Sequence, residues 1–214
     1  VDQHLVLDFQ AEQGELDFDN LFVAAFPYQK ISAGVIATFN ENDWLLAIND
    51  LELNSEVIDI SAELGILVPA AGDAHLSLLA NISNADASLV GRYLPLPLMS
   101  DNLVDYLNSA FISGRVDDAQ VLINGPLRRF PFTDGSGIFV VDAELSEAEF
   151  KFAEHWPSIT DFFANLNFTN NSMLITGRSG SLTGIDVTGV TAAIADLGSQ
   201  AVLDVDAKIN TTKT

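Results

Sequence analysis

The sequence predicts an all-β protein, made mainly of antiparallel strands with one or two short helices. Three observations lead to this prediction. Apolar and polar residues alternate with period two through most of the chain, as they do in strands with one dry and one wet face. Short segments rich in Gly, Asn, Asp and Ser separate the alternating runs. Only one segment places its apolar residues at the three- and four-residue spacing of a helix.

The alternating runs follow one another along the chain, and each predicts one strand. In the first half their apolar positions are Leu5, Leu7 and Phe9; Val35, Ala37 and Phe39; Trp44, Leu46 and Ile48; Leu51 and Leu53; Ile58, Ile60, Ala62, Leu64 and Ile66; and Leu76, Leu78, Ala80 and Ile82. In the second half they are Ala119, Val121 and Ile123; Phe139, Val141, Ala143 and Leu145; Phe162, Ala164, Leu166 and Phe168; and Leu203, Val205, Ala207 and Ile209.

Turns are predicted between these strands, at residues 40–43, 71–73, 133–137, 169–172 and 177–180. Such short connections favour hairpins and meanders over crossovers. No low-complexity stretch or Pro/Ser-rich linker divides the chain. We therefore expect residues 1–214 to form a single continuous β unit.

The one convincing helix is predicted from about Asp101 to Phe111. Ser100 suits the N-cap, Asp101 lies in the first turn, and the helix should end before Gly114. Its apolar face would be formed by Leu103, Val104, Leu107 and Phe111. A second, shorter helical turn is predicted to begin at Ser158, after Trp156 and Pro157.

Composition excludes several classes of protein. The chain has 30 Asp plus Glu and 9 Lys plus Arg, a formal charge of −21, yet it is 48% hydrophobic with a mean hydropathy of +0.25. A disordered acidic tail is poor in apolar residues, and a nucleic-acid binder needs excess Lys and Arg. The absence of cysteine excludes disulfides, thiol nucleophiles and Cys-based metal sites. No uncharged apolar run approaches the length of a membrane span.

The sequence contains no strong motif for catalysis, for a cofactor or for a metal. It has neither a G-x-S-x-G elbow nor a phosphate-binding Gly-rich loop followed by Lys. Asp73 and His75 could share one face of a strand, but a loop aspartate beside a surface histidine explains them more simply. Paired carboxylates such as Asp204 and Asp206 suit either calcium or, more simply, the wet faces of strands.

The dry faces of such strands need a covering. Either the sheet closes on itself as a sandwich or barrel, or it leaves an apolar surface for something else to fill. The natural ligand of an open face is a long apolar one. Burial contributes roughly 0.8 kcal/mol for each methylene, so a chain of about sixteen carbons has on the order of 12 kcal/mol available without any polar contact.

Several motifs follow one another in a specific order through residues 93–185. They are Tyr93-Leu94-Pro95, the amphipathic helix, Gly114-Arg115-Val116-Asp117-Asp118-Ala119, Gly125, Phe130-Pro131-Phe132, Gly137-Ile138-Phe139 and Trp156-Pro157. This order resembles the central region of the YhdP type of protein within the AsmA-like family of the Gram-negative envelope, a group that includes TamB and belongs with the bridge-like lipid transfer proteins. The resemblance covers a little under half of the chain.

The resemblance implies a non-enzymatic protein without a cofactor. Its fold would be an elongated, curled antiparallel sheet that forms an open hydrophobic groove, as a segment of a longer β structure. Its cargo would be phospholipid, moved between the inner and outer membranes in support of the outer-membrane permeability barrier. This piece would lie in the periplasm, and parts of a longer parent chain would anchor it in the inner membrane. The motif glycines Gly114, Gly125 and Gly137 would serve turns or close backbone approach.

The predicted groove lining joins this implied function to the alternating pattern. The lining candidates are Val121, Ile123, Phe139, Val141, Leu145, Phe150, Phe152, Phe162, Leu166 and Phe168. Leu103, Leu107 and Phe111 place the helix near the groove, where it either plugs part of it or simply fills the core. The alternative function is a structural β-sandwich, a spacer or adhesion module whose acidic face binds calcium.

Overall fold

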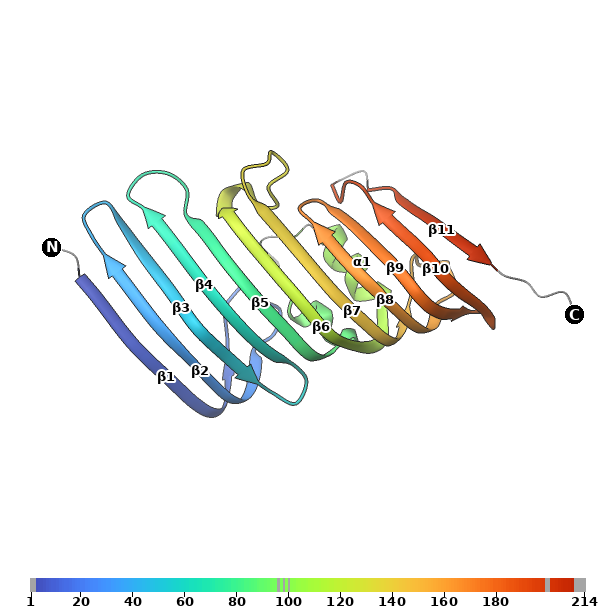
Figure 1. Ribbon diagram of the computed structural model, residues 1–214, viewed down its shortest axis with the longest axis horizontal. Helices are drawn as coiled ribbons and strands as arrows, with labels where there is room; N and C mark the ends of the chain where they lie inside the picture. Colours follow the sequence, from blue (N-terminus) through green and yellow to red (C-terminus); the bar gives the residue numbers. More distant parts are fainter. Residues whose placement is uncertain (1–2, 96, 98, 100, 199–200, 210–214) are drawn as a thin grey trace, which may run out of the picture.

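The computed structural model contains one antiparallel sheet of eleven strands, arranged in sequence order from β1 to β11 (Figure 1). The structure describes residues 3–95, 97, 99, 101–198 and 201–209. The strands are β1 (Gln3–Leu16), β2 (Phe26–Phe39), β3 (Asp43–Asn54), β4 (Asp59–Pro69), β5 (His75–Asp86), β6 (Phe111–Pro126), β7 (Ile138–Phe150), β8 (Ile159–Thr169), β9 (Ser172–Leu182), β10 (Ile185–Ile194) and β11 (Leu203–Ile209). The sheet is open, with β1 and β11 at its opposite ends (Figure 1). The all-β prediction is therefore confirmed, and the two-sheet sandwich of the alternative is not the architecture formed.

Helices occur in the connections of this sheet. Between β5 and β6 the chain forms η1 (Ala87–Arg92) and α1 (Asp101–Ala110), and η3 (Leu127–Arg129) follows β6. The predicted helix is confirmed, although Phe111 is already the first residue of β6. The proposed N-cap, Ser100, lies outside the described residues. Instead, the clear cap belongs to η1, where Asp86 accepts a hydrogen bond from the Ser88 amide at 2.9 Å.

Strand register brings the apolar positions of all eleven strands onto one side of the sheet, which we call the apolar face. One cross-strand row runs from β1 to β7, and a second runs from β3 to β11. The first row is Leu7, Val35, Ile48, Leu64, Leu78, Ile123 and Phe139. The second is Leu51, Ala62, Ala80, Val121, Val141, Phe168, Met173, Ile194 and Leu203.

Bulges keep these rows in phase where the sequence alternation slips. In β3 the apolar run ends at Ile48 and resumes at Leu51, an odd spacing that would turn the second run to the other face. Asp50 adopts a left-handed conformation with φ of 50° at this point, and the register shifts by one residue. Glu147, with φ of 47°, does the same between Leu145 and Ala148 of β7. Because each bulge also bends its strand, these residues help to curl the sheet.

Two motif glycines make room for a phenylalanine of the β6–β7 loop. Phe132 follows the cis peptide bond between Phe130 and Pro131 and is completely buried on the apolar face. A Cβ at Gly125 would approach the Phe132 ring to 2.6 Å, and one at Gly137 would approach the Asn124 carbonyl oxygen to 2.6 Å. Close approach is therefore confirmed as the role of both glycines.

Two of the predicted local elements are wrong. The helical turn predicted from Ser158 does not form, because β8 begins at Ile159 and pairs there with Phe150 and Leu182. The turn predicted at 177–180 is instead the interior of β9, and the chain reverses at Thr183 and Gly184. In both places, pairing with neighbouring strands overrides a local turn preference.

Candidate functional site

The apolar face is open to solvent in the middle of the first five strands. In β1, Leu5 is 57% exposed, and Leu7, which begins the first row, is 51% exposed. The neighbours of Leu7 along the first row are half-buried, namely Val35, Ile48, Leu64 and Leu78. Contiguous exposed apolar surface is unusual on soluble proteins and commonly marks a binding surface.

The same face is sealed over the last strands. Ala164 of β8, Ile175 of β9 and Ala192 of β10 are at most 1% exposed. They belong to one buried cluster that also contains Leu107 and Ala110 of α1. Figure 1 shows α1 behind the strands in the region of β7 to β9. Helix α1 therefore takes part in covering the apolar face at this end of the sheet.

Two smaller segments cover the rims of the apolar face. Residues 17–25, which connect β1 and β2, carry Phe22 onto a cluster formed by Phe26, Ile31 and Leu53. At the opposite ends of the strands, Phe132 packs on Leu76 and Ile123. Between these covers the middle of β1 to β5 stays uncovered.

The predicted lining residues divide into two groups in the structure. Val121, Phe139, Val141 and Phe168 are half-buried on the apolar face. Ile123 is buried under the β6–β7 loop, and the remainder lie in the cluster that includes α1: Leu145, Phe150, Phe152, Phe162 and Leu166. Of the helix candidates, Leu107 is buried, Leu103 packs against the cluster, and Phe111 contacts the Phe150 ring at 5.1 Å.

The most exposed part of the surface was absent from the predicted lining. Leu5, Leu7, Val35, Ile48 and Leu64 show the same alternation, but they precede the motif region from which the lining was chosen. The pattern that identifies the strands could have included them. Their exposure could not be read from it, because exposure depends on where the connecting segments fold.

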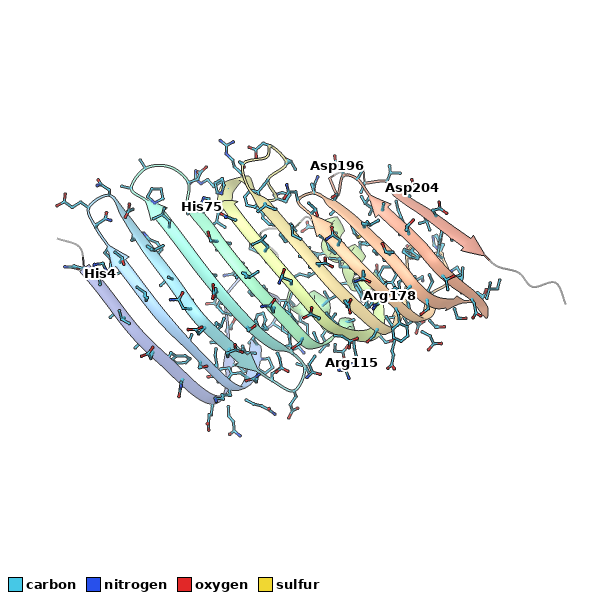
Figure 2. The ribbon with its side chains drawn as sticks, in the orientation of Figure 1. His4, His75, Arg115, Arg178, Asp196 and Asp204 are labelled. Carbon is cyan, nitrogen blue, oxygen red and sulfur yellow. The ribbon has the colours of Figure 1, made fainter. Side chains whose placement is uncertain are left out.

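The opposite, polar face carries hydrogen-bonding and charged side chains. A cross-strand row of Asn81, Gln120, Asp142 and Asn167 runs through its centre, with a Gln120-to-Asn81 hydrogen bond of 3.1 Å. Figure 2 shows that polar and charged side chains are distributed over many strands rather than gathered at one place.

The residues considered for a metal site have other partners. His75 lies 2.7 Å from Asn124, and Asp73 forms an ion pair of 3.6 Å with Arg128. His4, far from His75 in Figure 2, contacts Thr38 at 3.1 Å. Within the ranges that the structure describes, no three His, Asp or Glu side chains are grouped as metal ligands. No helix among those residues is long and apolar enough to cross a membrane.

One hollow lies on the polar face and is open to solvent. It measures about 300 Å³ and is bordered by Ala47, Gly65, Ser77 and Leu122, among others. A Cβ placed at Gly65 would touch nothing within 4 Å, so the hollow is largely the space of a missing side chain. It brings together no set of titratable groups suited to catalysis.

An ion pair between Arg129 and Asp134 helps to hold the β6–β7 loop, which carries Phe132. Hydrogen bonds from Ser136 and Arg129 hold the pKa of the Asp134 carboxyl well below its usual range, and the Arg129 contact measures 2.7 Å. Both groups are exposed, so this cluster shapes a surface loop and builds no reactive site.

Among the residues that the structure describes, two tyrosine hydroxyls are buried without a hydrogen-bond partner. They belong to Tyr93, which follows η1, and Tyr106 of α1. Burial raises the pKa of Tyr106 to about 12. A buried hydroxyl without a partner costs stability, roughly 1–3 kcal/mol by comparison with other proteins. The segment that covers the apolar face is therefore held less firmly than its packing alone suggests.

Tyr106→Phe is expected to stabilise the protein by about 1 kcal/mol at pH 7, because it removes an unpaired buried hydroxyl. Because burial raises the pKa of Tyr106 in the folded state, the unfolded chain loses the phenolic proton at a lower pH than the folded chain does. Stability should then fall as pH rises from about 10 to about 12, and Tyr106→Phe should lessen that fall. Urea unfolding at pH 7 and pH 11 measures both effects. A loss of stability at pH 7 would show that the hydroxyl has a partner in solution.

Comparison with known proteins identifies the family of this chain. Residues 2–214 match the family model described as YhdP protein. The chain belongs to the YhdP family. It is 28% identical over 204 residues to the intermembrane phospholipid transporter YhdP of Escherichia coli strain K12. That match covers 95% of this chain but 16% of the relative, so the chain spans about a sixth of the relative's length. No solved structure matches the chain.

Membership of the YhdP family confirms the resemblance first seen in residues 93–185. The family match extends it to strands β1 to β5, β10 and β11, where the sequence offered no distinctive motif. The open part of the apolar face therefore lies within the family match as fully as the sealed part does.

Proposed function

We propose that this chain binds phospholipid acyl chains on its apolar face and forms one segment of a path along which phospholipid moves between membranes. The observation that carries the proposal is the apolar face itself. It is continuous across all eleven strands, and in the middle of β1 to β5 it has no protein cover.

The chemistry of this face suits a sliding apolar ligand. Its rows are built from Leu, Ile, Val, Phe, Ala and one Met, and neighbouring strands lie about 4.8 Å apart. Burial of a methylene contributes roughly 0.8 kcal/mol wherever on the face it occurs. A surface that holds acyl chains equally well at each strand gives affinity without a deep site that would trap the cargo.

The comparison with a relative supports phospholipid as the cargo. The E. coli protein is an intermembrane phospholipid transporter, and this chain is similar to a part of it. We further propose that the chain lies in the periplasm of the Gram-negative envelope, as part of an inner-membrane-anchored protein that supports the outer-membrane barrier. The role is binding and passage, without an enzymatic step. The formal charge of −21 would keep the polar face in water and away from anionic headgroups.

The lining is proposed to differ in accessibility along the sheet. Acyl chains would contact the open rows of β1 to β5 and continue onto Val121, Phe139, Val141 and Phe168. Leu145, Phe150, Phe152, Phe162 and Leu166 are buried in this conformation, so lipid would reach them only after a change in their cover.

A phospholipid carrying a diazirine at the end of one acyl chain tests the proposal. After equilibration of the chain with vesicles that contain the probe, irradiation and mass spectrometry locate the labelled residues. We expect label on Val35, Ile48 and Leu64, and little on the polar-face neighbours Ile36 and Ala47, which provide a matched apolar control. Equal labelling of the two faces would contradict the proposal.

A further inference from the structure

We propose that α1, together with η1, is a displaceable lid which closes the apolar face over β7 to β10 and moves aside when lipid passes. This inference rests on the proposed function. The structure would then show the closed state, in which lipid has access to β1 to β5 and to the half-buried row positions as far as Phe168 of β8, but not to β9 and β10.

The first argument is the contrast along a single face. First-row positions on β1 to β5 are exposed or half-buried, whereas Met173, Ile175, Ala192 and Ile194 on β9 and β10 are at most 6% exposed. The second row itself continues through these strands, because Met173 pairs with Phe168 on one side and with Ile194 on the other. A ligand sliding along the rows would therefore meet α1 in its path.

The second argument is that the connection between β5 and β6 is far longer than the pairing of these two strands requires. Strands β5 and β6 are adjacent and antiparallel, and Asp86 already pairs with Arg115. A hairpin of this kind usually needs a loop of about two to five residues. Instead the chain leaves the sheet at Ala87 and returns at Phe111, and most of the intervening segment serves to cover the apolar face.

The third argument concerns how the lid is attached. Its buried contacts with the sheet are made by apolar side chains such as Leu107, which acyl chains could replace with similar contacts. A Cβ at Gly91 would overlap the side chain of Asn108, so η1 and α1 pack tightly enough to move as one body. At the end of α1, the Ala110 carbonyl accepts from the Lys151 amide at 2.9 Å, which would hold the hinge in place.

The Tyr106 hydroxyl also favours a lid that opens. Among the residues that the structure describes it has no hydrogen-bond partner in the closed arrangement, where it is buried, and water or the polar part of a phospholipid could satisfy it in the open one. The closed state thus lacks a hydrogen bond that the open state can form.

The absence of cysteine allows a direct test of lid motion in this chain. Ala192→Cys places one small thiol at a position that is 0% exposed on the sealed face. We expect Leu107→Ala to raise the rate at which maleimide modifies this thiol by about tenfold or more, because truncation weakens the packing of α1. Asp105→Ala, on the exposed side of the same helix, is the control and should leave the rate within about twofold.

The diazirine phospholipid then connects lid motion to lipid. In the wild-type chain we expect label on β2 to β4 and almost none on Ile175 or on β10. Leu107→Ala, and a second variant in which about eight Gly and Ser residues replace residues 87–110, should extend the label to those positions. Circular dichroism confirms that each variant keeps its sheet, and if the replacement fails to fold, Leu107→Ala alone decides.

The outcomes separate the lid from the proposed function. No label anywhere on the apolar face would contradict the function, and the thiol rates would still decide whether α1 opens. Equal thiol rates in Leu107→Ala and Asp105→Ala would overturn the lid. So would wild-type label on Ile175 as strong as that on Ile48, or a label pattern that neither folded lid variant changes.

Discussion

Val35→Asp should reduce the capture of phospholipid from vesicles by about tenfold or more, because a carboxylate on the apolar face must lose its hydration when an acyl chain covers it. Val35 lies in the centre of the open rows, between Leu7 of β1 and Ile48 of β3. The charge would therefore interrupt the surface where no protein segment shields it. Co-sedimentation with vesicles, or transfer of a fluorescent phospholipid, measures the effect.

Ile36→Asp provides the matched control for this prediction. Ile36 is the next residue of β2, is also half-buried and β-branched, and pairs with Val6 and Ala47 on the polar face. We expect it to leave lipid capture within about twofold of wild type. Urea unfolding of both variants shows whether the fold is equally affected. If the two variants lose capture equally while both remain folded, the apolar face is not the lipid surface.

Phe162→Ala is expected to destabilise the chain by about 3–5 kcal/mol, the cost usually seen when a fully buried phenylalanine is truncated. Phe162 is 1% exposed and its ring lies 6.0 Å from that of Phe150. A Cβ at Gly177 or at Gly180 on β9 would come within 3.0 Å of the ring. Because the two glycines have no side chains, they leave room for the Phe162 ring. Truncation of Phe162 therefore leaves a cavity that neither glycine can fill.

Phe163→Ala offers a comparison of the same size one residue away. Phe163 is half-buried, and its truncation should cost less than about 1.5 kcal/mol. Thermal or urea unfolding of the two variants gives the difference. Similar losses would mean that the sealed half of the sheet packs differently in solution from the arrangement described here.

The candidate site was predictable in kind but not in extent. Alternation identified both faces of the sheet, and the motifs in residues 93–185 indicated a lipid-related family. The lining chosen from those motifs included Phe150 and Phe162, which are buried in a packed cluster, and omitted Leu7 and Val35, which are open. A row position looks the same in sequence whether or not another segment lies over it.

The β-bulges were likewise predictable only in part from the sequence. The odd spacing between Ile48 and Leu51 is visible in the sequence, but it fits two separate strands as well as one bulged strand. The left-handed conformation of Asp50 resolves the ambiguity, because pairing with β2 and β4 on both sides holds the two runs on one face. The same kind of pairing converted the glycines at 177 and 180 from a predicted turn into part of β9.

By itself, the sequence determined local properties of this protein: most of the strands, the side on which the apolar residues of each uninterrupted run lie, the helix at 101–110, and the acidity of the wet face. These follow from near-neighbour chemistry, since period two and helix spacing act within a few residues. The tertiary structure decided that one open sheet forms and that α1 helps to cover its apolar face beyond β6 while the middle of β1 to β5 stays uncovered. That choice depends on contacts between residues far apart in the chain, whose packing no local pattern records.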